Sequence, residues 1–415
     1  RIQALALRIM TGAMPSTPFD SLNHLTNSTD IIIFLQGEAA KGAARLQAYE
    51  SWSLETIPHK GTIKAHTNIN NEFMADLNIP PTTKDLTIPM LNLERNFDIA
   101  TPGDNITDYR DQLRNTIDDL PSDSITCYTD GSRTDTGCGA GYIITTNNNN
   151  TTIHETSYKL PDYCTVFQAE LTAIREACNY LANTTNKHII IWTDSLSSIE
   201  AVTTLSIRSR TTRSCYEALN TLGTNNKLEL RWIAAHTGLW GNERADELAK
   251  LGTSSDTILN CPIPHSYIKK QINNKVSLLN QKEWKQNGPK HTKMILGNKQ
   301  AKIIRDLNTS LITNRRDYRT AVHIITGHCG LNNHLHKMKK TNTSECPLCG
   351  HEDENVSHFL GQCPAIAQLR GQYFNDYYLS VNDIFDNFHI TTIIKYVNHT
   401  NRLLEPEALD TSGVT

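Results

Sequence analysis

The sequence has few aromatic residues, no long apolar run and almost no net charge. Aromatic residues make up 7% of the 415 residues, but hydrophobic residues make up 38%, enough for the cores of about two to four domains. No apolar stretch approaches the ~18–20 residues that a membrane helix needs, which excludes an integral membrane protein and a membrane partner. No secretory signal opens the chain, and its first residue is Arg1. We therefore expect an intracellular protein, in the nucleus, the cytoplasm or both, that is the tail of a longer one.

The net charge of −3 hides a gradient along the chain. Residues 262–341 carry 16 Lys and Arg against 3 acidic residues, whereas residues 1–120 and 342–415 are acidic. Such asymmetry is typical of a surface that binds a polyanion such as an RNA or DNA backbone. A solvated, lysine-rich helical surface would have the same composition, so composition alone leaves both interpretations open.

Three of the ten cysteines cluster near the C-terminus, and the other seven show no framework spacing. Without a signal peptide, a reduced intracellular compartment is the better interpretation. The cluster has the spacing Cys346-x2-Cys349-x8-His358-x4-Cys363, which offers three thiolates and one imidazole to a structural zinc ion. The alternatives are three merely buried thiols, or His351 as the fourth ligand. A zinc unit of this kind could bind RNA or only hold the chain together.

Apolar periodicity predicts an α/β fold between residues 125 and 251. Strand-like runs alternate with helical ones in the order β-β-β-α-β-α-α-β-α, which favours a mixed sheet with helices packed on it. Residues 78–103 are rich in proline and threonine and indicate a linker or a loosely packed strap. The last stretch, from residue 373, is acidic and is expected to be irregular and partly disordered.

Four acidic residues stand out by position. Asp130 and Asp194 each follow an apolar strand, Glu170 lies in a helix, and Asp246 lies near the start of the last helix. Taken singly, each has an ordinary explanation as a turn former or a solvated helix residue. Together they can converge at one point, where their repulsion would be relieved by Mg²⁺ or, alternatively, Mn²⁺. Two such ions can activate water for phosphodiester cleavage, and His236 on its glycine-containing loop could shuttle a proton.

These acids belong to motifs that resemble the signature of type 1 ribonuclease H. The motifs are Tyr128-Thr-Asp-Gly-Ser132, Gln168-Ala-Glu-Leu171, Thr193-Asp-Ser195 and His236-x-Gly-x-x-Gly-Asn-Glu-x-Ala-Asp246. The resemblance implies a five-stranded mixed sheet, three antiparallel strands and then parallel ones, flanked by helices. It implies cleavage of the RNA strand of RNA–DNA hybrids with two Mg²⁺ ions.

The resemblance also assigns residues to roles. It implies that Asp130, Glu170, Asp194 and Asp246 are catalytic and hold the magnesium ions, with His236 as a catalytic loop histidine. It implies substrate contacts at Gly131, Ser132, Ser195 and Asn242. The short connection between Leu205 and Arg213 leaves little room for the basic handle helix of some cellular members, so part of the grip on the hybrid must come from elsewhere.

The flanks resemble the C-terminal part of jockey-like, non-LTR (LINE-type) retrotransposon reverse transcriptases. The resemblance lies in residues 4–18 and 323–370, and no Tyr-x-Asp-Asp polymerase signature is present. We expect five segments without a polymerase core, and the polymerase part of the same element as a partner. They are a helical polymerase-adjacent segment with a linker (1–122), a ribonuclease H domain (123–256), a basic helical segment (257–341), a zinc unit (342–372) and an acidic tail (373–415).

The predicted function is a metal-dependent endonuclease that removes the RNA strand of RNA–DNA hybrids during retrotransposon reverse transcription. The alternative is a catalytically inactive, nucleic-acid-binding remnant, because copies of transposons decay. A DNA nuclease on a related fold is disfavoured by the His236 loop and by the Asp130-Gly131-Ser132 entry.

Overall fold

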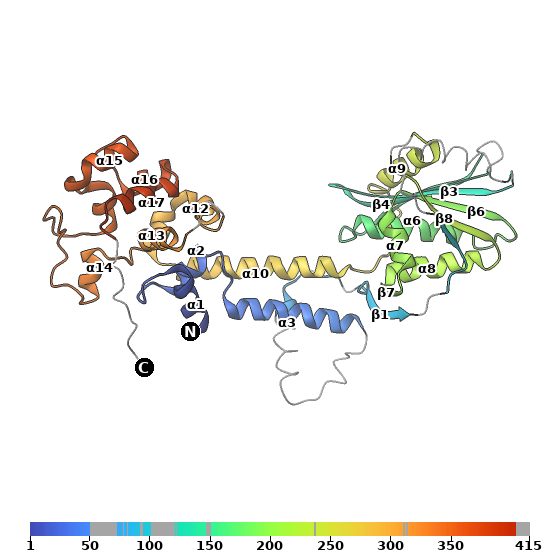
Figure 1. The fold of residues 1–415 in the computed structure, drawn as a ribbon. Coiled ribbons are helices and arrows are strands. Elements are labelled where there is room, and N and C mark those ends of the chain that lie inside the picture. Colours follow the sequence, from blue (N-terminus) through green and yellow to red (C-terminus); the bar gives the residue numbers. More distant parts are fainter. Residues whose placement is uncertain are drawn as a thin grey trace, which may run out of the picture. The chain divides into compact units, whose positions relative to one another are not determined.

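The computed structural model (Figure 1) describes residues 1–49, 73–77, 79–80, 82–91, 94–100, 121, 123–146, 151–235, 238–309, 312 and 314–403. The chain divides into two compact units. The sheet unit comprises residues 37–273, and the terminal unit combines residues 1–36 with residues 274–415. The units do not follow the five expected segments, because the two ends of the chain fold together. None of the described helices is long and apolar enough to cross a membrane.

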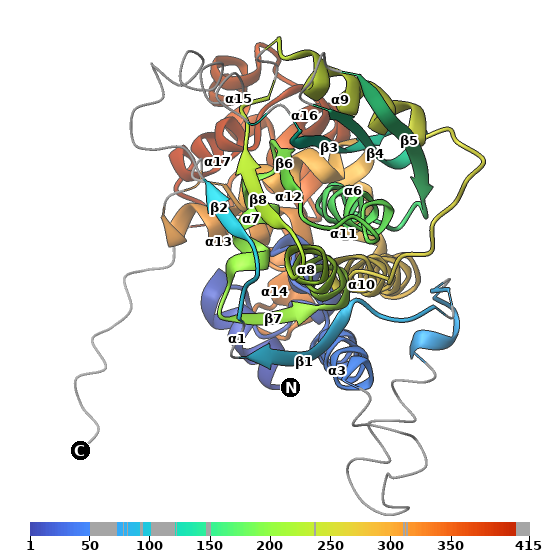
Figure 2. The same ribbon diagram turned by 90° about the vertical axis from the view of Figure 1, so that its right-hand side faces the viewer.

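A six-stranded mixed sheet forms the centre of the sheet unit. Its antiparallel strands are β3 (Ile125–Thr134), β4 (Gly137–Thr146) and β5 (Thr152–Leu160). Its parallel strands are β6 (His188–Thr193), β8 (Lys227–Trp232) and β2 (Asp98–Ala100). The strand order is β2-β8-β6-β3-β4-β5 (Figure 2). The expected mixed sheet is therefore confirmed, and β2 adds one edge strand to the expected five.

Helices cover both faces of this sheet. They are α6 (Val166–Tyr180), α7 (Leu196–Thr203), α8 (Arg210–Gly223) and α9 (Trp240–Gly252). Side chains alternate between the faces of a strand, so neighbouring residues enter different cores. Cys127 and Ile144 pack with α6, α7 and α8, whereas Tyr128 and Ile143 pack with α9. Figure 1 shows α9 alone on its side of the sheet.

The expected strap of residues 78–103 contains strands. β1 (Leu86–Leu91) pairs antiparallel with β7 (Ser206–Ser209), and β2 extends the main sheet. The Asp85 carboxylate fixes this segment, because it accepts hydrogen bonds from Ser209 Oγ at 2.9 Å and from Thr211 N at 2.9 Å. Short edge strands depend on a partner far away in the chain, so local composition did not reveal them. β7 also occupies the short connection between α7 and α8.

The terminal unit has one apolar core built from both ends of the chain. Its helices include α1 (Ile2–Thr11), α2 (Phe19–Leu25), α11 (Lys290–Leu296), α12 (Gln300–Leu307), α13 (Arg315–Thr326), α14 (Asn332–Lys337), α15 (Ala367–Phe374), α16 (Val381–Asn387) and α17 (Ile390–His399). Leu22 and Leu25 of α2 share the core with Ile324 of α13 and Ile393 of α17. Two further helices, α3 (Ile31–Ala48) and α10 (His265–Asn287), contribute residues to both units.

The expectation of an irregular tail is wrong for residues 381–399, which form α16 and α17. Asp383 and Asp386 lie exposed on α16, while Ile384 on the same helix is buried. The acidic composition therefore belongs to the outer face of an amphipathic segment, and the apolar face completes the core. The part of the expected disorder that falls on residues 404–415 lies outside the described residues.

One buried carboxylate of the sheet, Glu229 on β8, is held by cationic neighbours. It accepts hydrogen bonds from His188 Nε2 at 2.6 Å and from Arg231 Nε at 2.7 Å, and Lys227 Nζ lies at 3.2 Å. Burial alone would raise the pKa of Glu229, but the bonds from Arg231 and His188 outweigh it and lower this pKa to about 2.

Glu229→Gln should remove an acid-sensitive part of the stability. A carboxyl group with a lowered folded-state pKa stabilises the fold above its unfolded pKa, and this contribution disappears as the pH falls towards 2. The wild type should exceed the variant by on the order of 2–3 kcal/mol at pH 7, and the difference should shrink below pH ~4.5. Urea unfolding followed by tryptophan fluorescence measures this. A difference that stays constant down to pH ~2.5 would contradict the assignment.

Candidate active site and metal centres

Three of the four expected catalytic carboxylates meet beside the two central strands of the sheet, β3 and β6. Asp130 lies on β3, Glu170 on α6, and Asp194 directly after β6, and one oxygen of each lies within 4.8 Å of the others. The pairing of Thr129 with Thr193 brings Asp130 beside Asp194. The sequence suggested that Asp130 follows the end of a strand. It lies within β3 instead, because residues 131–134 continue to pair with β4.

The position of Glu170 depends on how closely α6 packs against β3. A Cβ atom at position 131 would lie 2.4 Å from the backbone nitrogen of Glu170, so only glycine permits this approach. The start of α6 is fixed by a capping box between Thr165 and Gln168. The buried Gln168 amide also donates to the Pro262 carbonyl at 2.9 Å. No role was expected for Gln168, although the Thr-x-x-Gln pattern at residues 165–168 predicts such a cap.

The crowding of these acids changes their protonation. Burial, followed by repulsion from Asp194 and Asp246, raises the pKa of Asp130 to about 7. Burial and repulsion from Asp130 and Asp194 raise the pKa of Glu170 well above its usual value. The cluster also contains one buried carboxylate oxygen, Glu170 Oε2, without a hydrogen-bond partner among the described residues.

The fourth carboxylate, Asp246, lies on α9, near the cluster but not within the group of three. Its Oδ2 accepts a hydrogen bond from Lys250 Nζ at 2.6 Å, one helical turn later. α9 approaches β4 closely, because a Cβ atom at Gly141 would lie 2.4 Å from the Ala249 nitrogen. The sequence analysis did not identify Lys250, although the i,i+4 spacing of Asp246 and Lys250 is a known pairing distance.

The remaining expected site residues have mixed outcomes. His236 lies outside the described residues. Ser132 is half-buried on β3, and Ser195 precedes α7, with its Oγ 2.8 Å from Ser198 Oγ. Asn242 is buried on α9, and its Oδ1 has no hydrogen-bond partner among the described residues. The substrate contacts assigned to these residues and to Gly131 stay predictions.

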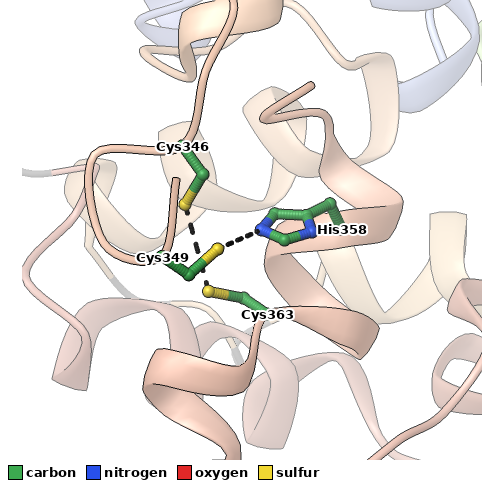
Figure 3. Close-up of side chains that lie close together, drawn as sticks. All are labelled: Cys346, Cys349, His358 and Cys363. Carbon is green, nitrogen blue, oxygen red and sulfur yellow. Dashed lines mark hydrogen bonds between the residues drawn. The ribbon is translucent and has the colours of Figure 1, made fainter. Parts of the chain in front are cut away.

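The four expected zinc ligands converge in the terminal unit (Figure 3). Cys346 Sγ lies 3.9 Å from Cys363 Sγ, and Cys349 Sγ lies 3.3 Å from His358 Nε2. Tetrahedral zinc with bonds of about 2.3 Å to sulfur separates two sulfurs by about 3.8 Å, which matches the first distance. All four donor atoms lie within 4.8 Å of one another. The His351 ring stacks on the His358 ring at 4.3 Å and is not one of these donors.

Buried hydrogen bonds hold the ligand loops in place. The Cys346 amide donates to the His351 carbonyl at 2.8 Å, and His358 begins the π-helical turn η3 (His358–Gln362). The fully buried Arg370 donates to the carbonyls of Leu360 at 2.7 Å, of Cys363 at 2.9 Å and of Tyr377. The first bond closes the loop that carries Cys346 and Cys349, and the Arg370 contacts hold the Cys363 backbone from α15, outside the loop.

A second buried group, Glu354, joins the zinc unit to other parts of the terminal unit. Its Oε1 lies 3.9 Å from Cys346 Sγ, and its carboxylate pairs with Arg402 at 2.5 Å. Oε2 also accepts a hydrogen bond from the Asn332 amide at 2.7 Å, at the start of α14. The zinc unit, α14 and the end of α17 are thus connected through one carboxylate.

The part of the chain that carries the acid cluster matches a known protein family. Residues 122–254 match the family model described as RNase H. These residues form an RNase H domain. The resemblance expected from the four motifs is confirmed for this part of the chain.

Known proteins similar to the chain come from two groups. A stretch of 48 residues is 44% identical to the retrovirus-related Pol polyprotein from type-1 retrotransposable element R1 of Bradysia coprophila. This stretch is 12% of the chain and only 5% of that polyprotein. The match agrees with the retrotransposon resemblance of the sequence.

Two solved structures each cover 32% of the chain. RNase H1 from Halobacterium salinarum NRC-1 is 20% identical, is 98% covered and has a TM-score of 0.27. The N-terminal RNase H domain of rv2228c from Mycobacterium tuberculosis is 17% identical, is 95% covered and has a TM-score of 0.28.

Asp194→Asn should stabilise the protein when metal ions are removed. The raised pKa of Asp130 means that the native state binds more protons than the unfolded state, so stability falls as the pH rises from about 4 through 7. Removing one repelling charge should reduce this fall and stabilise the variant by on the order of 1 kcal/mol at pH 8. Urea unfolding in EDTA at pH 5 and pH 8 measures the effect.

A matched control is Asp135→Asn, which removes an exposed carboxylate in the turn between β3 and β4. It should leave the pH dependence unchanged. The repulsion argument fails if both variants show the same dependence as the wild type.

Proposed function

We propose that this chain is a metal-dependent endonuclease that hydrolyses the RNA strand of RNA–DNA hybrids during retrotransposon reverse transcription. The observation that carries the proposal is the convergence of Asp130, Glu170 and Asp194 within 4.8 Å inside an RNase H domain. The fold accounts for binding of a hybrid, and the acid cluster would supply the chemistry. No specific observation favours the alternative of an inactive remnant, because all four expected carboxylates are present.

The acid cluster fits divalent cations. Its raised pKa values and the unpartnered Glu170 Oε2 indicate hard oxygen donors that a cation would stabilise. Asp130, Glu170, Asp194 and Asp246 would hold two Mg²⁺ ions, with Mn²⁺ as an alternative. Bound there, such ions supply an activated water and stabilisation of the leaving oxygen in phosphodiester hydrolysis.

The residues of the chain would then divide the remaining tasks. Asp246 would have to exchange its partner Lys250 for a cation, and the freed ammonium would lie beside the site. His236 would move a proton to or from the reacting oxygens, as its residue type and loop position suggest. Ser132, Ser195 and Asn242 would contact the hybrid backbone, and Gly131 would keep the strand surface open beside Asp130.

Further contacts to RNA or DNA backbone are proposed for the basic segment 262–341. Its long helix α10 exposes several lysines, namely Lys269, Lys270, Lys282 and Lys285. Exposed ammonium groups can contact backbone phosphates without reading sequence. The polymerase part of the same element would be a further partner.

The cysteine cluster is proposed to hold a structural zinc ion. Cys346, Cys349, His358 and Cys363 provide a closed set of four donors with separations suited to tetrahedral coordination. Four protein ligands would leave no open coordination position on the ion for a substrate. The ion would therefore stabilise the fold and take no part in cleavage.

Asp194→Asn should abolish hybrid cleavage. Loss of a cation ligand removes several kcal/mol of transition-state stabilisation, so the rate should fall at least about 100-fold. The assay uses a hybrid labelled on its RNA strand with Mg²⁺, and the control Asp135→Asn should cleave like the wild type. Absence of cleavage by the wild-type chain, or full activity of Asp194→Asn, would overturn the proposal.

Cys346→Ser should release about one equivalent of zinc while the RNase H domain stays folded. The structure adds a sharper comparison between two histidines. His358→Asn should also lose zinc, whereas His351→Asn should retain it, because only the His358 ring belongs to the donor group. Metal content by atomic spectroscopy tests this. The ligand set would be rejected if His351→Asn lost zinc while His358→Asn retained it.

A further inference from the structure

A cavity of about 630 Å³ lies in the terminal unit beside the zinc unit. Four chain segments line it: the loop at Ser16, helix α11, residues 326–338 and residues 353–357. Most of the third segment belongs to the His-Ile-Ile-Thr-Gly-His-Cys-Gly-Leu-Asn-Asn-His motif, to which no role has yet been given. Cavities of this volume are typical of sites for small organic groups.

The polar part of the lining is a chain of neutral hydrogen-bonding groups. Ser16 Oγ lies 3.1 Å from His328 Nδ1 and 3.0 Å from His334 Nε2, and the two rings lie 4.5 Å apart. Burial, and then repulsion from His334 and His291, lowers the pKa of His328 to about 4. Burial also lowers the pKa of His334 and of His291. At neutral pH these imidazoles offer donors, acceptors and flat faces without charge.

The rest of the lining combines apolar surface with one cation. Met294, Leu331 and Met338 supply adaptable apolar contacts, and the exposed Lys337 donates to Asn333 Oδ1 at 2.6 Å. The two acids of the lining are already hydrogen-bonded. Asp353 accepts hydrogen bonds from the amides of two other lining residues, Asn333 and Asn355, and Glu354 pairs with Arg402 outside the lining. The cavity therefore presents flat, neutral and polar groups with an ammonium at its edge.

We propose that this cavity binds one unpaired nucleotide of a single-stranded RNA or DNA, with its base among the imidazoles and methionines and its phosphate beside Lys337. The inference rests on the proposed function, since it names where the chain would hold nucleic acid outside the RNase H domain. A paired base has its edge occupied by its partner, whereas an unpaired base offers both a polar edge and two faces.

The charges around the cavity support a nucleic-acid strand over an isolated small molecule. Lys290 precedes the lining residue His291, and Lys339 and Lys340 follow the lining residue Met338, and all three lysines are exposed. Backbone phosphates on either side of the bound nucleotide would meet these ammonium groups. A metal ion is a weaker occupant, because no three donor side chains of the described lining lie within 4.8 Å of one another.

The position of the cavity gives the zinc unit a specific task. Residues 353–357 form one wall, and they lie between the ligands Cys349 and His358. The same wall is tied to α14 through Glu354 and the Asn332 amide. Zinc would therefore shape the binding site without touching the nucleic acid.

The test uses the full chain with zinc and fluorescent single strands of about 12 nucleotides, one of RNA and one of DNA. Lys337→Ala and His334→Ala should weaken binding at least about fivefold in fluorescence anisotropy. The control Lys395→Ala removes an exposed lysine of α17 away from the cavity and should change binding less than about twofold. Weakening with only one of the two strands would still support the site and would identify the sugar that it prefers.

A direct readout places the bound base. Strands that carry one photoreactive thiobase should cross-link to peptides from residues 326–338 or 353–357. Cross-links confined to other peptides would overturn the proposal, and so would an unchanged affinity of Lys337→Ala for the single strands. Neither outcome depends on His334→Ala being stably folded. At saturating hybrid both variants should keep the cleavage rate of the wild type, because the acid cluster is unaltered, whereas their affinity for a single strand falls. Loss of the cavity and loss of the RNase H function are thus separately visible.

Discussion

Repulsion among buried carboxylates is the constraint on which the sheet unit depends. Glu170 lies within 4.8 Å of Asp130 and Asp194 because α6 approaches the sheet more closely than a side chain at Gly131 would allow. This arrangement costs free energy in the absence of a cation. The apolar cores on both faces of the sheet offset that cost. The feature that weakens the metal-free protein is therefore the one that a bound cation would relieve.

The terminal unit depends on a different kind of buried charge. Glu354 is fully buried, and its partners come from the start of α14 and from the end of the described chain. Breaking a buried ion pair by removing one partner typically costs about 3–5 kcal/mol. The charge gradient along the sequence thus does not mark separate bodies, because its basic stretch and its acidic tail contribute to one core.

The sequence predicted best what depends on short-range patterns. The strands and helices of the RNase H domain follow from apolar periodicity, and the convergence of three cysteines and one histidine follows from their spacing within 18 residues. The carboxylates were found because each lies in a local motif. Gln168 and Lys250 were missed as partners of the site, although capping and i,i+4 patterns pointed to them.

Contacts between residues far apart in the sequence could not be predicted from such short-range patterns. β1 and β2 are edge strands whose partners lie more than 100 residues later in the chain. The tail was misjudged because its acidic residues lie on the outer face of α16, and its apolar residues show their role only beside a core. The contact between Ser16 and His328 joins residues 312 positions apart, and no local signal could reveal it.

The hydrogen bonds of Arg370 determine whether the segment with the Cys/His cluster can be separated from the rest of the chain. Its guanidinium joins the Leu360 and Cys363 carbonyls of the zinc loop to the Tyr377 carbonyl beyond it. A peptide cut to residues 342–372 would keep all four metal ligands but lose Tyr377 and Arg402. It would leave the Arg370 guanidinium without its Tyr377 acceptor and the buried Glu354 carboxylate without Arg402 and the Asn332 backbone amide. Residues 342–372 are therefore not a portable module, and exchange of this segment between proteins would have to move the helices around it as well.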